Sequence, residues 1–333
     1  MRLTAALLPW LALAAVGCRS VPTVAGAAVD TLAPAELLAA AEAAHERDAH
    51  LEVAEAAEYY LTHHFDEPGV DRARWRAAEA RFALEEYPAA LVHYRRLLDE
   101  NPFTERSLEI AGRVWTIGET LVWREGGWFE DLAAERDVGV EALNLLVTHF
   151  PRDERADDAW KELAAAFAHD GAWQAAADIY ERLVREYPES EWRDLALFKV
   201  CEAYARQSRG GAFGVDPLYL ADAALVRYLA VYPDGNFVEE AEAERRRLAD
   251  EITRHELLVA DFYAERGHED GERLHLTNAA LRFPETEAAG VARERLAARG
   301  WEPDEASLDL LRPRRDRPPW RQRGTGGKPA GRR

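Results

Sequence analysis

The chain has 333 residues and a formal charge of −19 at pH 7, but its C-terminal end is strongly basic. Residues 312–333 hold nine Lys and Arg residues against the single Asp316, so this tail carries +8 and the rest of the chain carries −27. A body this acidic argues against nucleic acid as the main ligand, because phosphate contacts need clustered Lys and Arg. Length alone suggests two globular domains, but length does not predict the number of domains in a repeat array, which forms one continuous structure.

The N-terminus predicts export and a lipid anchor. Arg2 precedes a largely apolar run of 14 residues, Leu3–Val16, which is too short for a transmembrane helix of about 20 residues and suits the core of a signal peptide. The run ends in Ala15-Val16-Gly17-Cys18, which resembles the lipobox of bacterial lipoproteins, whose cysteine receives a diacylglyceryl group and becomes the mature N-terminus. We therefore expect residues 1–17 to be a lipoprotein signal peptide and Cys18 to be lipidated. A conventional signal peptide with an incidental cysteine is the alternative.

The residues after the cysteine refine this expectation. In lipoproteins an Asp directly after the cysteine commonly retains the protein at the inner membrane, whereas this chain has Arg19. We therefore expect a lipid-anchored protein on the periplasmic face of the outer membrane, held by two or more acyl chains. Residues 18–33, rich in Ala, Val, Thr and Pro, are expected to be the lipidated cysteine followed by a flexible tether.

From residue 34 onward, apolar residues recur at spacings of three and four, as in helices with one buried face. The clearest unit runs from Asp157 to Pro188, with Gly171 in the turn between its two helices. Its pattern residues are Trp160, Leu163, Ala164, Phe167, Ala176, Tyr180, Leu183 and Pro188. This is the spacing of a tetratricopeptide repeat, a 34-residue helix-turn-helix unit whose small residues let the two helices approach. An ordinary helical hairpin with coincidental spacing is the alternative.

The repeats before this unit follow the same pattern with local departures. The first spans about 34–68. The second, 71–102, matches if its turn is one residue shorter, and it then places Glu79 at the position of Ala164, which predicts looser packing or a slightly different register. The third, about 106–151, is expanded in its middle. We expect the segment Trp123–Val138 to be a surface loop that could carry function.

The repeats after the clearest unit change towards the C-terminus. The fifth, about 191–233, has a lengthened turn from Ser208 to Pro217. The last begins with nearly unbroken helical pattern over Asn236–Arg266, breaks at Gly267 and continues in a second helix to about Leu281. Residues 287–298 supply a capping helix, and the basic Pro-, Arg- and Gly-rich residues 300–333 are expected to be disordered.

The predicted fold class is therefore all-α, a tetratricopeptide-repeat superhelix of about five to six helix-turn-helix units over residues 34–299. The closing turns support the register of these repeats. Each ends in a proline, and four of the five have an aromatic residue before it: Asn101-Pro102, Phe150-Pro151, Tyr187-Pro188, Tyr232-Pro233 and Phe283-Pro284.

Together with the lipobox and these turns, two further segments resemble the BamD family, also called ComL or YfiO, of outer-membrane lipoproteins in the β-barrel assembly machinery. They are Phe213-Gly214-Val215-Asp216 and the run His255-Glu256-x-x-Val259-Ala260-x-Phe262-Tyr263-x-x-Arg266-Gly267. The resemblance covers about residues 34–298. It implies a scaffold that docks on the periplasmic domains of the barrel assembly subunit and helps recognise unfolded outer-membrane proteins.

The chain also departs from this family. The third repeat is longer than expected, and the basic tail has no counterpart. In the last repeat the family commonly has an arginine nine residues before the closing proline, a partner-contact position, where this chain has His275. Arg273 lies two residues away on a different helix face, so the resemblance implies an altered ionic contact with the assembly subunit.

Candidate partner-binding residues follow from the fold as well. The concave face of such a repeat array is lined by outward positions of each first helix. These are Asp158, Lys161, Ala165, Ala168 and His169 in the fourth repeat, and Arg76, Ala80 and Leu84 in the second. Such a mixed polar and small lining suits an extended peptide or a partner loop. The alternative is that the charged members are simply solvated surface residues.

Catalytic, metal and cofactor sites find no support in the sequence. His255-Glu256 lacks the second histidine of a zinc-protease motif, and the adjacent His63 and His64 point to different helix faces. Cys201, the one cysteine besides Cys18, sits at a small-residue position of its repeat and is expected to be buried. We therefore expect a non-enzyme with no cofactor, no metal and no small-molecule substrate.

Three alternatives stay open at this point. A lipoprotein scaffold of another envelope complex, such as a secretion, pilus or Tol-Pal-type system, would have the same fold. A cell-wall enzyme would need an unrecognised site in the Trp123–Val138 loop. The basic tail around Trp320 could contact anionic lipid headgroups, or it could be a disordered solubilising extension.

Overall fold

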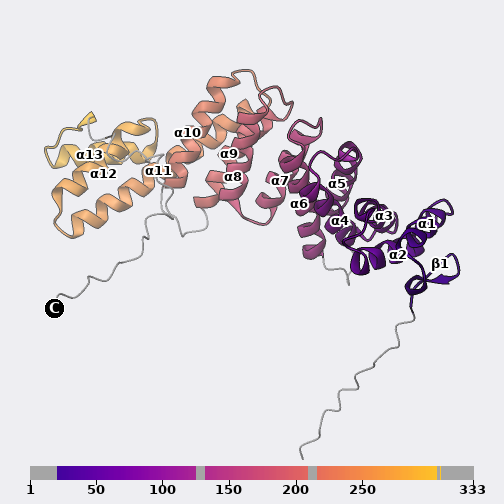
Figure 1. The fold of residues 1–333 in the computed structure, drawn as a ribbon. Coiled ribbons are helices and arrows are strands. Elements are labelled where there is room, and N and C mark those ends of the chain that lie inside the picture. Colours follow the sequence, from indigo (N-terminus) through magenta and orange to yellow (C-terminus); the bar gives the residue numbers. More distant parts are fainter. Residues whose placement is uncertain (1–20, 125–131, 209–215, 306–307, 309–333) are drawn as a thin grey trace, which may run out of the picture. The chain divides into compact units, whose positions relative to one another are not determined.

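The computed structural model describes residues 21–124, 132–208, 216–305 and 308, and helices dominate this part of the chain (Figure 1). The first helices are α1 (Pro34–His45), α2 (His50–His63), α3 (Val70–Ala83), α4 (Tyr87–Glu100), α5 (Ser107–Val122) and α6 (Leu132–His149). The later ones are α7 (Ala156–His169), α8 (Trp173–Glu186), α9 (Arg193–Ser208), α10 (Asp216–Val231), α11 (Val238–Glu265), α12 (Glu269–Arg282) and α13 (Glu287–Ala298). Helices next to one another in the sequence pack together as hairpins, among them α1 with α2, α3 with α4, α7 with α8 and α11 with α12. The predicted all-α tetratricopeptide fold is confirmed.

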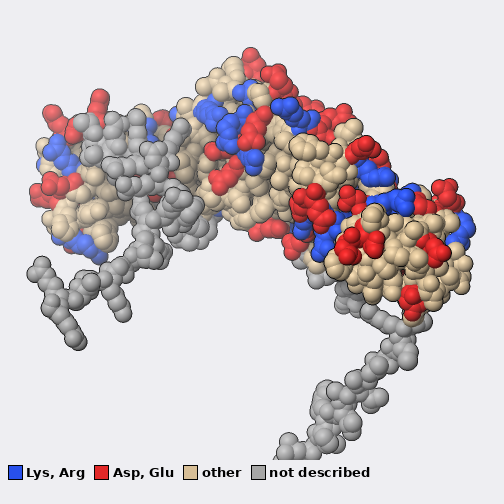
Figure 2. All heavy atoms as spheres, in the orientation of Figure 1, with Lys and Arg blue, Asp and Glu red and all other residues tan. Residues whose placement is uncertain are grey.

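The contacts divide the chain into two compact units, Met1–Val114 and Trp115–Arg333, with the boundary inside α5. Within each unit the repeats contact their neighbours, as expected of a repeat protein. Figure 2 shows Asp and Glu side chains on both units, with Lys and Arg side chains interspersed among them. No helix in the described parts of the chain is both long and apolar enough to cross a membrane.

The prediction of a flexible tether is wrong for residues 21–33, which are folded. Strands β1 (Thr23–Val24) and β2 (Ala27–Ala28) pair antiparallel and are followed by a short 3-10 helix, Val29–Thr31. Val24 and Val29 are fully buried in the apolar core of the α1–α2 hairpin. The backbone N–H of Ala25 also donates to Glu52 of α2 at 3.0 Å. Burial of these two valines therefore stabilises a segment whose composition indicated a linker.

The turn inside several hairpins contains one residue in the left-handed region. Asp48, Glu85, Gly171 and Gly267 occupy this position, with φ between 55° and 75°. Glycine stands at only two of the four positions, and Glu85 gives no sequence signal for a left-handed residue. The turn after α3 and the turn after α7 have the same backbone hydrogen bonds, so they also have the same length.

This equality corrects the predicted register of the second repeat. Its turn is not one residue shorter, so α3 is shifted by one position relative to the prediction. Ala78, fully buried, takes the place of Ala164, which is also fully buried. Glu79 instead takes the place of Ala165, on the groove side of the helix. The looser helix packing predicted at Glu79 is therefore unnecessary.

The loop of the third repeat is shorter than expected. Helix α5 continues to Val122 and α6 begins at Leu132, so residues 132–138 are helical and not part of a surface loop. Residues 125–131 lie outside the described residues. A Cβ atom at Gly118 would collide with the side chain of Leu143, so glycine allows α5 and α6 to approach closely there.

Two predictions about the later repeats are confirmed. The pattern over Asn236–Arg266 forms one helix, α11, of 28 residues. Cys201 is 1% exposed, and its burial raises the pKa of the thiol to about 12. This thiol therefore stays protonated at neutral pH and packs as a small apolar group.

The predicted N-terminal boundary of the disordered tail, residue 300, is slightly too early in the sequence. The backbone N–H of Trp301 donates to Leu296 at 2.9 Å, and its indole packs on the apolar cluster of α11, α12 and α13. The guanidinium of Arg299 also lies over the Trp301 ring, 5.3 Å from its centroid. The folded part therefore includes Trp301, while residues 309–333 lie outside the described residues.

Candidate protein-binding groove

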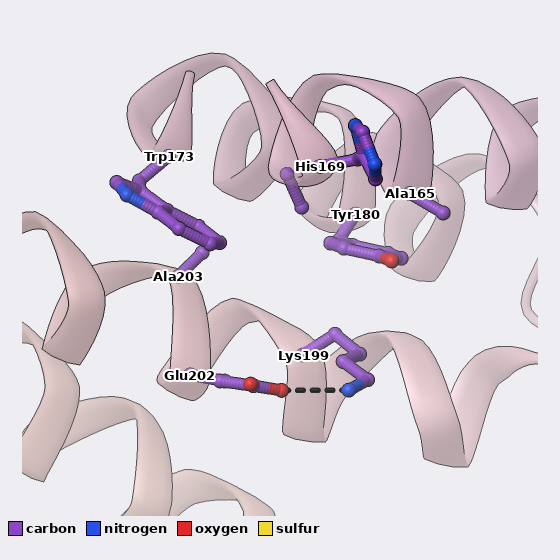
Figure 3. A pocket seen from close by; sticks show the side chains of 8 residues that line it. Ala165, His169, Trp173, Tyr180, Lys199, Glu202 and Ala203 are labelled. Atoms are coloured by element: carbon purple, nitrogen blue, oxygen red, sulfur yellow. Dashed lines mark hydrogen bonds and ion pairs between the residues drawn. The ribbon is translucent and has the colours of Figure 1, made fainter. Parts of the chain in front are cut away.

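A cavity of about 290 Å³ lies among α7, α8 and α9 in the second unit (Figure 3). Its walls come from three helices and combine small, aromatic and charged side chains. They are Ala165, Ala168 and His169 of α7, Trp173 and Tyr180 of α8, and Lys199, Glu202 and Ala203 of α9. In Figure 3 the His169, Trp173 and Tyr180 side chains face Lys199 and Glu202.

The periodicity of α7 explains why this groove is open. Trp160, Leu163 and Ala164 form the buried stripe that packs against α8, and each is at most 6% exposed. Ala165 and Ala168 lie beside that stripe, facing the groove. Because both are alanines, their side chains leave the space between α7 and α9 unfilled at these two positions.

Tyr180 presents a hydroxyl group at the groove. Its side chain is only 4% exposed, and burial, with added repulsion from Glu202 and Glu162, raises the pKa of the phenol. The hydroxyl group therefore stays protonated and can donate a hydrogen bond. Among the described residues it has no hydrogen-bond partner.

The charged groups of the groove are paired with each other. Lys199 Nζ lies 2.6 Å from a carboxylate oxygen of Glu202, three residues along α9. On the rim, Arg136 of α6 donates to Asp170 at 3.0 Å and lies 3.2 Å from the Nδ1 atom of His169. Within the described residues, no group of three or more His, Cys, Asp or Glu side chains could hold a metal ion. The groove offers hydrogen bonds and ring surfaces to a ligand.

Of the residues predicted for the fourth repeat, His169 lines the cavity together with Ala165 and Ala168. Asp158 instead accepts a hydrogen bond from the indole N–H of Trp192 at 2.6 Å. Lys161 places its Nζ 4.0 Å from the centroid of the same indole ring. Asp158 and Lys161 therefore hold the start of the fifth repeat against the fourth.

The residues predicted for the second repeat do not line an open groove. Ala80 is 3% exposed and packs against the α1–α2 hairpin, and Arg76 forms an ion pair with Glu42 of α1. Leu84 is half-buried at the end of α3. The one-residue register error explains all three, because it assigned positions next to the true groove face.

In the last repeat His275 points inward. Its side chain is 13% exposed, and its Nδ1 atom lies 2.6 Å from a carboxylate oxygen of the buried Glu256. The imidazole stacks on the ring of Tyr263, with centroids 5.4 Å apart. The hydroxyl group of Tyr219 donates to Glu256 as well. His275 thus belongs to a polar cluster inside the repeat, where it is not displayed for the altered partner contact that the resemblance implied.

Arg273, the neighbouring candidate, donates from its guanidinium to the backbone carbonyl of Glu302 at 3.1 Å. It therefore ties the segment after α13 to α12. Cys18, the predicted lipidation site, lies outside the described residues.

Sequence reasoning missed five residues of the cavity wall: Trp173, Tyr180, Lys199, Glu202 and Ala203. The spacing on α8 predicts a core position for Tyr180 and gives no sign of its hydroxyl group in the groove. The α9 residues could have been found by projecting the groove positions of α7 onto the next first helix, because adjacent first helices form opposite walls of one groove.

Comparison with known proteins finds one protein family and several solved structures. The model of the YfiO family, described as outer membrane lipoprotein, matches residues 133–292. A tetratricopeptide repeat protein from Parabacteroides merdae has 10% sequence identity and a TM-score of 0.31, and the match covers 79% of this chain and 97% of that one. The C-terminal part of a TPR repeat-containing protein from Cytophaga hutchinsonii has 12% identity and a TM-score of 0.22, covering 77% and 98%.

No curated protein matches the sequence. Both TM-scores are low, so the fold assignment rests on the helical hairpins of the chain itself. The family match spans the chain from α6 into α13 and includes all three helices of the groove. The resemblance to the BamD (ComL/YfiO) family is therefore confirmed for residues 133–292.

Proposed function

We propose that this protein is a non-catalytic scaffold lipoprotein of the outer-membrane protein assembly machinery. It is anchored at the periplasmic face of the outer membrane, docks on the periplasmic domains of the barrel assembly subunit and binds segments of unfolded outer-membrane proteins. The observation that carries the proposal is the match of residues 133–292 to the outer membrane lipoprotein family YfiO. That matched segment contains the open groove among α7, α8 and α9.

The chemistry of the groove supports a polypeptide ligand. An extended polypeptide presents unpaired backbone N–H and C=O groups that require partners on binding. The Tyr180 hydroxyl group can donate to a carbonyl, and the Lys199–Glu202 pair supplies both a donor and an acceptor. Ala165 and Ala168 leave space for a backbone to approach α7.

The folded segment 21–33 limits how far the proposed anchor can lie from the first hairpin. Three peptide steps connect Cys18 to Val21, and consecutive Cα atoms are about 3.8 Å apart, so the lipidated cysteine can lie no more than about 11 Å from Val21. The β1–β2 hairpin that follows packs on α1 and α2. A lipid on Cys18 would therefore hold the first hairpin close to the membrane surface.

Affinity purification of the full-length protein from crosslinked native envelopes tests the proposal. We expect mass spectrometry to recover a β-barrel protein with periplasmic repeat domains, and metabolic labelling with palmitate to mark the wild type but not a Cys18→Ala variant. Recovery of secretion, pilus or Tol-Pal components without that barrel protein would replace the proposed role with a scaffold of another envelope complex.

A further inference from the structure

The chain contains a second groove of the same construction, which serves as an internal reference for the first. Helices α3, α4 and α5 have 14, 14 and 16 residues, as do α7, α8 and α9. Each helix of the second set begins 86 residues after its counterpart, and the turns within the two hairpins have the same hydrogen bonds. Residues 86 positions apart are therefore structurally equivalent between the two sets.

In the first unit this groove is filled by the chain itself. Glu79 of α3 accepts hydrogen bonds from the hydroxyl group of Tyr94 at 2.6 Å and from Arg113 at 3.0 and 2.8 Å. The Arg113 guanidinium also lies over the ring of Phe82, 4.7 Å from its centroid. That ring in turn contacts Tyr87, with centroids 5.6 Å apart. A carboxylate and a phenyl ring thus occupy the space beneath the cation.

The second unit has equivalent residues around the groove but lacks the two side chains that fill it. Tyr180 stands for Tyr94, Lys199 for Arg113 and the ring of Trp173 for that of Tyr87. Ala165 and Ala168 stand where the first unit has Glu79 and Phe82. The cavity of about 290 Å³ lies where these two side chains are missing.

The charges of the open groove indicate whether a ligand would supply a carboxylate, like Glu79, or a ring, like Phe82. Lys199 already has a carboxylate partner, because Glu202 lies 2.6 Å away. Besides burial, Glu202 and Glu162 both raise the pKa of Tyr180, so two carboxylates already lie near its hydroxyl group. A ligand carboxylate would be repelled there. The phenyl ring has no replacement in this groove, and neither does the acceptor for the tyrosine hydroxyl group.

We propose that this cavity binds one aromatic side chain of an extended partner polypeptide, with its ring at the position equivalent to Phe82. The ring lies between Trp173 and the Lys199 ammonium group, and a backbone carbonyl of the partner accepts the hydrogen bond from Tyr180. The cavity is at the small end of ligand sites, which suits a single side chain rather than a cofactor. This inference rests on the proposed function, because it takes the ligand to be a protein segment.

Binding of probe peptides to the full mature protein in detergent micelles tests the proposal. The probes are fluorescein-labelled Thr- and Ser-rich peptides that differ only in one central residue, which is Phe, Leu, Ala or Glu. We expect the Phe peptide to bind at least about tenfold more tightly than the Ala peptide, because a buried ring contributes both apolar area and ring contacts. Leu is expected to be intermediate and Glu the weakest. Equal binding of the Phe and Ala peptides would overturn the proposal.

A variant that fills the cavity provides the matched test. Ala168→Phe introduces the side chain that the first unit already has at the equivalent position, and we expect it to abolish the preference for Phe over Ala. Ala297→Phe, on the exposed face of α13, makes the same change away from the groove and should keep the preference. A folded Ala168→Phe variant, checked by circular dichroism, that still prefers the Phe peptide would also overturn the proposal.

A crosslinking measurement in the wild type does not depend on the folding of any variant. A probe with benzoyl-phenylalanine at its centre should label proteolytic fragments that contain Ala168 or Ala203. Labelling confined to fragments outside α7, α8 and α9 would contradict the proposed site. These peptide assays are independent of the envelope purification, so loss of the assembly role would leave a preference for Phe intact, and loss of that preference would leave the assembly role intact.

Discussion

The grooves of the two units share one backbone plan and differ in what fills them. In the first unit, Glu79 and Phe82 close the groove with a hydrogen-bonded carboxylate and a ring. In the second unit, Ala165 and Ala168 leave the same space open. Two side chains on one face of a first helix therefore distinguish the filled groove from the open one. The repeat fold provides the groove, but not its use.

In the first unit, charged side chains also connect α3 to α2. Arg81 stands where the fourth repeat has Phe167, and its guanidinium donates to Glu58 of α2 at 2.7 and 2.6 Å. His93 lies 3.4 Å from the same carboxylate. This part-buried ion pair therefore ties α3 to α2 in the first unit.

The largest expected effect is the loss of the carboxylate that closes the first groove. Glu79→Ala leaves the Tyr94 hydroxyl group and the Arg113 guanidinium without their common partner, and we expect the free energy of unfolding to fall by about 3 kcal/mol. Denaturant unfolding measures this change, with Glu105→Ala at an exposed position of the same unit as the control. A loss similar to that of the control would show that the closed groove does not contribute to stability.

The next effect concerns a second polar cluster, inside the last repeat. His275→Ala removes the imidazole from the buried Glu256, and we expect a loss of about 2 kcal/mol in the free energy of unfolding. Arg273→Ala, which removes only an exposed bond to a backbone carbonyl, should cost much less. If His275→Ala instead weakened partner binding at unchanged stability, His275 would be a contact residue, at the position where the family has its arginine.

Acid should weaken the Glu58 ion pair of the first unit. Burial alone would raise the pKa of Glu58, but hydrogen bonds from His93 and Arg81 lower it from 4.5 to about 2. A lowered pKa stabilises the fold above about pH 4.5, and this contribution is lost as the pH falls towards about 2. Because the side chain is 33% exposed, we expect about 1 kcal/mol. In unfolding measurements across this range, Glu58→Gln should lose less stability than the wild type, and an equal pH dependence would contradict the assignment.

The smallest expected effect concerns the turn after α3 and the turn after α7. Glu85 and Gly171 occupy the same left-handed position, with φ of 58° and 75°. A side chain there costs about 1 kcal/mol, so Glu85→Gly should raise the free energy of unfolding by about 0.5–1 kcal/mol and Gly171→Ala should lower it by a similar amount. Opposite signs in thermal or denaturant unfolding would confirm that the turns are equivalent. Two changes of the same sign would mean that they differ.

Much of the fold could be predicted because helical periodicity and turn residues repeat along the chain. The position of Ala164 opposite Ala176, the single long helix after Asn236 and the burial of Cys201 all follow from local pattern. The register of α3 could not be predicted in the same way. Glu85 hides the left-handed turn position, and Arg74 stands where the fourth repeat has Trp160, so the aromatic and glycine landmarks are missing.

The candidate site was only partly predictable for a related reason. Spacing on α7 indicates which residues face a groove, and Ala165, Ala168 and His169 do line it. Whether a groove is open depends on side chains from three helices, and Lys199 becomes part of the site only when α9 packs beside α7. His275 shows the converse, since its position in the family pattern indicated a surface contact while its pairing with Glu256 places it inside the repeat.

The central claim is that the open groove of the second unit holds a protein partner. Crosslinked purification from native envelopes, run in parallel on the wild type, Ala168→Phe and Ala297→Phe, tests it most directly. We predict that the wild type and Ala297→Phe recover the same partners and that Ala168→Phe, although present at the same level, loses at least one of them. An unchanged set of partners with the filled groove would contradict the claim.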